Sequence, residues 1–208
     1  MARTAAELDV EFTVNWHPYF LDVTLSTTGL AKRESYRSKG MNEASLAKME
    51  RSMSRAFEAE GISYTLDGDT GNTVDSHRLA AWAYSKFGAT VQNQLVDVMF
   101  RQFFSDKRSP ADRSALREAA EEVGIDGALA AEFLESDAGR QHVLEQAHAL
   151  MTAPSVTGVP HYFVTVQGTQ TAEKPAGVAN QIPGAQDTET FYLALKALVA
   201  KAKQQARL

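Results

Sequence analysis

The stretch best suited to a binding or catalytic role is "SVTGVPHYFV", residues 155–164, which places Val159, Pro160 and His161 where a strand should begin. Proline donates no ladder hydrogen bond, so it fits the first position or the edge of a strand. An X–Pro bond becomes cis at little cost, and Gly158 allows a close backbone approach. The pattern predicts a cis bond before Pro160. His161, whose imidazole titrates near neutral pH, is either a proton donor or a half-exposed strand residue, and we favour the second interpretation.

Two other groups of residues also combine polar and aromatic chemistry. In "DSHR", Asp75 is a candidate helix cap and His77 a candidate donor to a loop carbonyl, so we expect a structural role rather than a cleft-lining one. Trp16 precedes His17 and Pro18 at a predicted strand end, and we expect its ring to pack in the core.

No metal or cofactor site is expected. His142 and His148 are six residues apart and do not share a helical face at i, i+4. The acidic "DGDTGN", residues 67–72, resembles neither a phosphate-binding loop nor a complete calcium loop. The chain has no cysteine, which excludes disulfides, cysteine-ligated metals and a thiol nucleophile within these 208 residues.

The bulk composition is that of an ordinary globular protein with 44% hydrophobic and 23% charged residues. A net charge of −5 argues against nucleic acid or an anionic membrane as a partner. No apolar run approaches the roughly 20 residues needed to cross a bilayer, and "MARTAAELDV" lacks a signal-peptide core. We expect a cytoplasmic protein.

Hydrophobic periodicity predicts a strand, a long helical block, two more strands and a last helix. Residues 9–20 alternate polar and apolar like a half-buried strand, and the expected hairpin strands are 161–167 and 178–182. Helices are expected over 30–40, 43–61, 72–88, 90–106, 109–124, 126–136, 137–153 and 187–205.

Four stretches in order resemble the DsbA-like thioredoxin family, and within it the FrnE-type proteins. They are "VNWHPYFLD", "GNTVDSHRLAAWA", "SVTGVPHYFV" and "IPGAQDTETFYLAL", which are spread between residues 12 and 198, nearly the whole chain. The resemblance implies an α/β, thioredoxin-like fold with a large all-helical insertion. It implies a core made of residues 10–40 and 151–205 and an insertion over residues 41–150.

The family's catalytic signature is a Cys-x-x-Cys pair on a helix after the first strand, and this sequence has neither cysteine. Only 15 residues precede Trp16, so we expect the first strand–helix unit to be missing, with "MARTAAEL" as the stump of its helix. Either the reading frame begins further upstream or the chain is a natural short form. In a short form, we expect the remaining strands to re-pair or a homodimer to fill the gap.

The resemblance implies thiol–disulfide exchange, but a chain without cysteine is expected to be redox-inactive, with no catalytic residue to assign. Its substrate-binding residues would be Val159, Pro160 and His161, facing an extended peptide or a glutathione-like thiol ligand. One alternative is a glutathione-binding protein like the kappa-class transferases and isomerases. Another is a non-catalytic peptide-binding or chaperone-like module.

Overall fold

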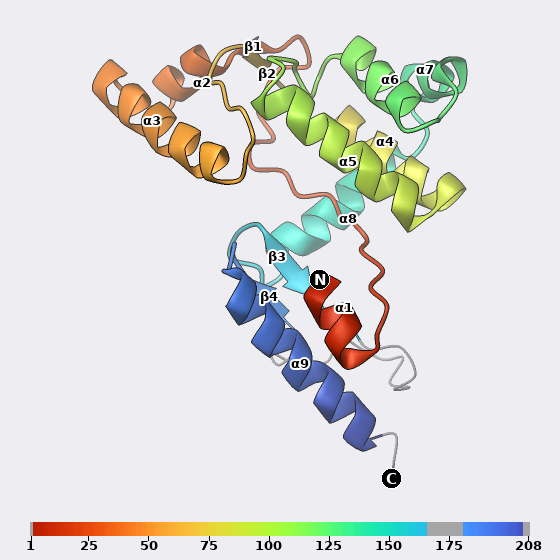
Figure 1. Ribbon diagram of the computed structural model, residues 1–208. Coiled ribbons are helices and arrows are strands. Elements are labelled where there is room, and N and C mark those ends of the chain that lie inside the picture. The colour runs from red at the N-terminus through yellow and green to blue at the C-terminus, as the bar shows by residue number, and fades with distance from the viewer. Residues whose placement is uncertain (1, 166–180, 206–208) are drawn as a thin grey trace. The chain divides into compact units, whose positions relative to one another are not determined.

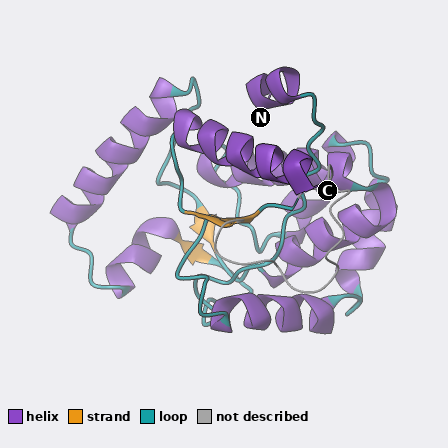
Figure 2. Cartoon of the chain, turned by 90° about the horizontal axis from the view of Figure 1, so that it is seen from below, coloured by secondary structure: helices purple, strands orange, loops and turns teal. Residues whose placement is uncertain are grey.

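Two compact units make up the chain (Figure 1). A computed structural model describes residues 2–165 and 181–205, most of them helical (Figure 2). Val14–His148 form the helical unit, and Met1–Thr13 with Ala149–Leu208 form the terminal unit. The described elements are α1 (Ala2–Leu8), β1 (Leu30–Ala31), α2 (Lys32–Ser38), α3 (Glu43–Ala59), β2 (Asp69–Thr70), α4 (Val74–Phe87), α5 (Ala89–Phe104), α6 (Arg113–Glu122), α7 (Gly127–Glu135), α8 (Arg140–Thr152), β3 (His161–Phe163), β4 (Gln181–Pro183) and α9 (Thr188–Gln205). None of the described helices is long and apolar enough to cross a membrane.

The core of the helical unit lies among α4, α5, α6 and α7. Small side chains alternate with large ones there, which lets the helices approach closely and interlock. Trp82 of α4 stacks on Phe133 of α7, with ring centroids 4.8 Å apart. The buried residues of this core are Leu79, Ala83, Leu95, Val98, Leu116, Ala119, Ala120, Ile125, Ala130 and Leu134. Burial of this apolar surface is the main stabilising contribution to the unit.

Helix ends follow the capping chemistry of the sequence. The side chain of Asn42 accepts a hydrogen bond from Ser45 N at 2.9 Å, as predicted for the start of α3. Asp112 and Asp126 cap α6 and α7 in the same way. Gly88 separates α4 from α5 with φ +86°, a backbone conformation that suits glycine. That single residue lets the chain reverse between two long helices.

Residues 9–20 do not form the predicted strand; beyond the end of the short helix they are irregular. In the helical unit, amide side chains on α5 satisfy the backbone of this segment in place of a partner strand. Gln92 accepts from Trp16 N at 2.9 Å and donates to Trp16 O at 3.1 Å. Asn93 donates to Val14 O at 3.2 Å and accepts from Trp16 Nε1 at 2.7 Å. Trp16 remains 38% exposed, so the prediction that it packs in the core is wrong.

These hydrogen bonds also place the boundary between the two units differently from the boundary that the sequence predicts. The sequence assigns residues 10–40 to the thioredoxin-like core, whereas Val14 to Gly40 group with the helical unit. The short pairing of β1 with β2 is a second reason, because it ties Leu30 to Thr70.

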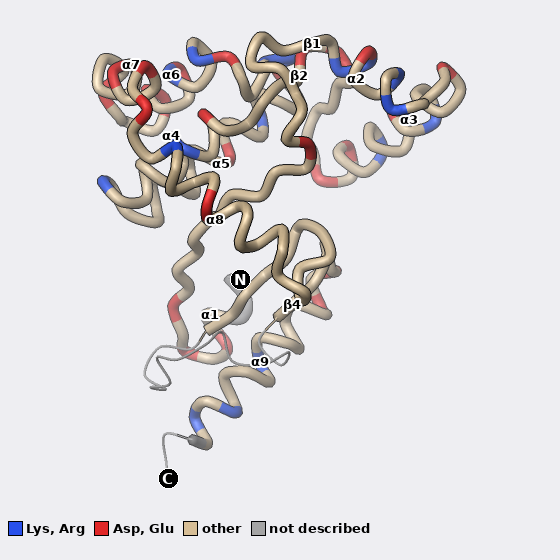
Figure 3. Tube along the Cα trace, turned by 180° about the vertical axis from the view of Figure 1, so that it is seen from behind, with Lys and Arg blue, Asp and Glu red and all other residues tan. Residues whose placement is uncertain are grey.

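Charged residues of both signs are interspersed along the helical unit (Figure 3). Many form surface ion pairs, such as Arg101–Glu122 and Arg117–Glu121. Exposed pairs of this kind each contribute little stability.

The terminal unit contains the predicted hairpin. β3 and β4 are antiparallel, with His161, Tyr162 and Phe163 opposite Pro183, Ile182 and Gln181. The predicted strand residues 166–167 and 178–180, and the loop predicted between them, lie outside the described part of the chain. Helix α9 begins as predicted beside Asp187, whose carboxylate accepts from Thr190 N at 2.8 Å. α9 contacts α1, where the Tyr192 hydroxyl donates to Glu7 and the Lys203 ammonium donates to Leu8 O.

Candidate functional site

The peptide bond between Val159 and Pro160 is cis, as the sequence predicts, and β3 starts at the next residue. Pro160 O accepts a hydrogen bond from Gly184 N at 2.8 Å. Pro160 therefore occupies the strand's entry, where its missing N–H leaves no gap in the ladder.

The hydrogen-bond pattern fixes which backbone groups of β3 face outwards. Bonded and non-bonded pairs alternate along an antiparallel ladder. Since Pro160 is bonded to Gly184, the pair His161–Pro183 is non-bonded and Tyr162–Ile182 is bonded. Pro183 lacks an N–H and fits the non-bonded position. The N–H and C=O groups of His161 and Phe163 therefore point away from β4. Among the described residues, β3 pairs with β4 alone, so this outer edge has no strand partner.

The two faces of the hairpin differ in how far other residues of the unit cover them. Ile182 is buried, and the Tyr162 ring packs edge-on against Phe191 of α9 with centroids 4.9 Å apart. On the opposite face, His161 and Phe163 lie side by side, their ring centroids 4.8 Å apart. Val159 is 42% exposed and Phe163 is 40% exposed. The outer edge of β3 is thus flanked by exposed apolar side chains.

His161 is held as a strand residue. Its Nε2 lies 3.0 Å from Gln181 Oε1. Its Nδ1 is buried and has no hydrogen-bond partner among the described residues. One ring nitrogen is engaged by Gln181 and the other is closed off, so the geometry favours the strand role over that of a proton donor.

The "DSHR" residues belong to the helical unit. Asp75 does not cap α4, because it lies inside the first turn and its carboxylate accepts from Arg78 and Arg113. Asn72 Oδ1 accepts from Val74 N instead. His77 bonds to the backbone of Tyr19, as predicted for a loop carbonyl. Burial lowers the pKa of His77 to about 4, although that hydrogen bond acts in the opposite direction. His77 also packs against the Phe20 ring at 5.3 Å. These contacts hold residues 19–20 against α4.

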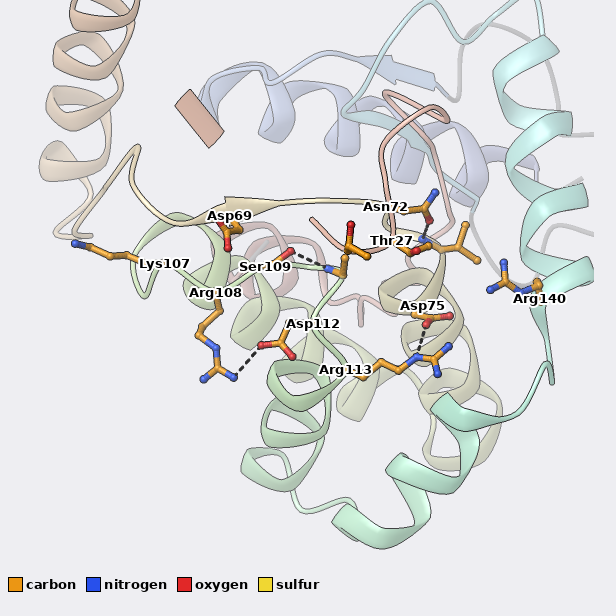
Figure 4. Close-up of a pocket in the computed structure, with 13 residues that line it drawn as sticks. Thr27, Asp69, Asn72, Asp75, Lys107, Arg108, Ser109, Asp112, Arg113 and Arg140 are labelled. Atoms are coloured by element: carbon orange, nitrogen blue, oxygen red, sulfur yellow. Dashed lines mark hydrogen bonds and ion pairs between the residues drawn. The ribbon is translucent and has the colours of Figure 1, made fainter. Parts of the chain in front are cut away.

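The structure reveals a hollow that the sequence did not suggest. It has a volume of about 780 Å³ and lies within the helical unit (Figure 4). Its walls come from residues 27–28, 69–75, 107–113 and Arg140. No short motif joins segments so far apart in sequence. The only available signal was the clustering of Gly, Asn, Asp and Ser in the loops that form the walls.

Comparisons with known proteins agree with the geometry of the terminal unit. The family model of the DSBA-like thioredoxin domain matches residues 2–196. The crystal structure of a probable DsbA oxidoreductase from Streptomyces coelicolor is similar, with 26% identity and a TM-score of 0.68 over 86% of this chain and 71% of that chain. No curated protein matches the sequence. With residues 2–196 covered, the chain belongs to the DSBA-like thioredoxin domain family and has that family's thioredoxin-like fold with a helical insertion.

Proposed function

We propose that this chain is a FrnE-type member of the DsbA-like family that binds extended polypeptide without thiol chemistry. The binding site is the outer edge of β3, with Val159, Pro160 and His161 at its start. It supplies backbone hydrogen bonds and apolar side-chain contacts, and nothing is oxidised or reduced.

The outer edge of β3, with which no other described strand pairs, is the observation that carries this proposal. Its outward N–H and C=O groups, at His161 and Phe163, are spaced for a strand from another polypeptide. Strand addition of this kind takes its affinity from main-chain hydrogen bonds and its selectivity from alternate side chains. Exposed Val159 and Phe163 would contact apolar side chains of the bound segment.

The chemistry of the sequence supports binding over catalysis. Thiol–disulfide exchange needs an attacking thiolate, and these 208 residues include no cysteine. A polypeptide bound at β3 would therefore dissociate unchanged from this chain. A cytoplasmic location fits the proposal, because non-covalent binding requires no oxidising compartment.

An extended peptide is a better partner than the alternatives. The net charge of −5 and the interspersed charges in Figure 3 do not suit nucleic acid or an anionic membrane. A second copy of the chain could pair through the same edge to form a homodimer. Glutathione could occupy the edge as a short peptide, as in the kappa-class proteins. The binding experiment separates these three occupants.

The test uses fluorescein-labelled, cysteine-free peptides with alternating apolar residues, titrated with the full chain and followed by fluorescence anisotropy. We expect saturable binding that Val159→Lys and Phe163→Lys each weaken at least tenfold, since either lysine would place a charge against an apolar ligand. Leu193→Lys is the control, because Leu193 is an exposed apolar residue on α9 of the same unit.

The outcomes discriminate clearly. An equal loss of peptide affinity in all three variants would refute the peptide site. So would the absence of saturable binding to the unaltered chain. Displacement of the peptide by millimolar glutathione would favour the glutathione-binding alternative. A dimer at the same protein concentrations, dispersed by Phe163→Lys, would favour self-pairing.

A further inference from the structure

The hollow of the helical unit is bounded by closely fitted loops. Gly71 lies against Ala111 so tightly that an added Cβ would be 2.7 Å from the Ala111 Cβ. Asn72 donates from its backbone to Ser26 O at 2.9 Å and from its side chain to Leu25 O at 3.3 Å. Ser109 Oγ accepts from Ala111 N at 3.2 Å. Contacts of the wall residues with one another and with residues 25–26 therefore hold the walls together.

One end of the hollow is cationic. Arg113 donates from Nε to Asp75 Oδ2 at 2.8 Å, and Arg140 donates from Nε to Asp137 Oδ1 at 3.2 Å. Within the part of the chain that the structure describes, the terminal nitrogens of these two arginines make no hydrogen bond to protein. Figure 4 shows both guanidinium groups near Asp75, one from α6 and the other from the start of α8.

The acidic groups do not cancel this charge. Asp75 also binds the buried Arg78, at 2.6 Å, so one carboxylate is shared between two guanidinium groups. Asp137 is 90% exposed and lies outside the lining of the hollow. The Asp75 end therefore has excess positive charge and free N–H donors. Such paired guanidinium groups suit the oxygens of a phosphate, which they bind through parallel hydrogen bonds.

The other end offers a carboxylate beside cations that already have partners. Asp69, Lys107 and Arg108 line it, and Figure 4 places them away from Arg113 and Arg140. Lys107 pairs with Asp67, and Arg108 pairs with Asp112 and Glu118. A carboxylate accepts hydrogen bonds from hydroxyl or amino groups. The remaining volume exceeds what a bare phosphate would fill. We infer that the hollow is a binding site for a small phosphate monoester that bears hydroxyl groups, with its phosphate between Arg113 and Arg140. This site is independent of the β3 edge.

Isothermal titration calorimetry of the full chain with ribose 5-phosphate, inorganic phosphate and ribose tests this inference. We expect saturable binding of ribose 5-phosphate at one site, weaker binding of phosphate and none of ribose. Arg140→Gln should weaken ribose 5-phosphate binding at least tenfold, because it removes half of the guanidinium pair. Arg140→Lys keeps the charge but lacks the two parallel N–H donors of a guanidinium group, so it should also weaken ribose 5-phosphate binding.

Arg117→Gln is the matched control. Arg117 is a half-exposed arginine of the same unit, paired with Glu121, and it does not line the hollow. It should leave the dissociation constant within a factor of two. Equal weakening by Arg140→Gln and Arg117→Gln would show a nonspecific charge effect and overturn the inference. No saturable binding to the unaltered chain, or ribose binding as well as ribose 5-phosphate, would overturn it too. Circular dichroism of each variant confirms that the helices remain folded.

Discussion

At the residue scale, Arg78 is the main polar anchor of the helical unit. Its side chain is fully buried on α4. It donates to Asp75 Oδ1 at 2.6 Å and to the carbonyls of Phe133, Ser136 and Ala138. The guanidinium thus satisfies carbonyls in the last turn of α7 and in the residues that follow it. A buried charge with this many partners holds one geometry, and its removal leaves the carbonyls of Ser136 and Ala138 unsatisfied.

Replacement of Arg78 by alanine should therefore strongly destabilise the chain. We expect Arg78→Ala to lower the free energy of unfolding by about 3–5 kcal/mol, because it leaves the carbonyls of Ser136 and Ala138 without the guanidinium donor and removes the buried ion pair with Asp75. Arg117→Ala removes an exposed pair with Glu121 and should cost no more than about 0.5 kcal/mol. Urea unfolding followed by circular dichroism measures both. Similar losses in the two variants would contradict the anchoring role of Arg78.

The local sequence predicted the candidate site at Pro160 but not the hollow of the helical unit. The geometry at Pro160 and the hairpin after it followed from residues 155–164 alone, because proline restricts its own neighbourhood. The hollow beside Arg113 and Arg140 did not, because distant loops build it. The prediction that Asp75 caps its helix was wrong, and its ion pair with Arg113 was missed because that pair depends on how α4 packs near α6.

At the scale of elements, helices were predictable and strands less so. A helix satisfies its own backbone, so periodic residues and caps such as Asn42 are sufficient signals. A strand needs a partner that its own sequence does not specify. Residues 9–20 alternate as a strand does, yet Gln92 and Asn93 of α5 take the partner's place. The prediction of the hairpin was confirmed because β3 and β4 pair with each other, so the local sequence contains both strands.

Gly88 offers a test of how one element is joined to the next. It is the residue between α4 and α5, with φ +86° and ψ 179°, and an added Cβ would meet nothing within 4 Å. Gly88→Ala therefore isolates the cost of the backbone conformation, and we expect a loss of about 1–3 kcal/mol in unfolding free energy. Gly158 also has open space around it but no positive φ. Gly158→Ala should be neutral or slightly stabilising in the same urea experiment. A neutral Gly88→Ala would show that the helices tolerate another turn geometry.

At the scale of the whole molecule, the two units can be followed separately. Both tryptophans, Trp16 and Trp82, lie in the helical unit, so tryptophan fluorescence reports its unfolding. The same unit contains His77, where residues 19–20 meet α4. Because burial lowers the pKa of His77 to about 4, the folded unit keeps this imidazole neutral well below its ordinary value of 6.5. Burial lowers the pKa of His17 as well.

These shifts predict that the helical unit loses stability in mild acid. Above pH 6.5 His77 is neutral in both states and favours neither. As the pH falls from 6.5 towards 4, the unfolded chain takes up a proton that the folded unit does not, so unfolding becomes easier. For His77 alone, the free energy of unfolding should fall by about 2 kcal/mol between pH 7 and pH 5. Most surface carboxylates stay ionised over that interval, including Asp22, whose pKa is lowered to about 2 by hydrogen bonds from Lys39 and Thr24.

Urea unfolding curves at pH 7 and pH 5, recorded by tryptophan fluorescence, measure the effect. His77→Gln removes the titrating group while keeping an N–H donor for Tyr19 O, and it should abolish most of the difference between the two pH values. His142→Gln replaces an exposed histidine on α8 and should leave that difference intact. If the unaltered chain were equally stable at both pH values, or if His142→Gln removed the difference as fully as His77→Gln, His77 would not be the group that makes the helical unit acid-sensitive.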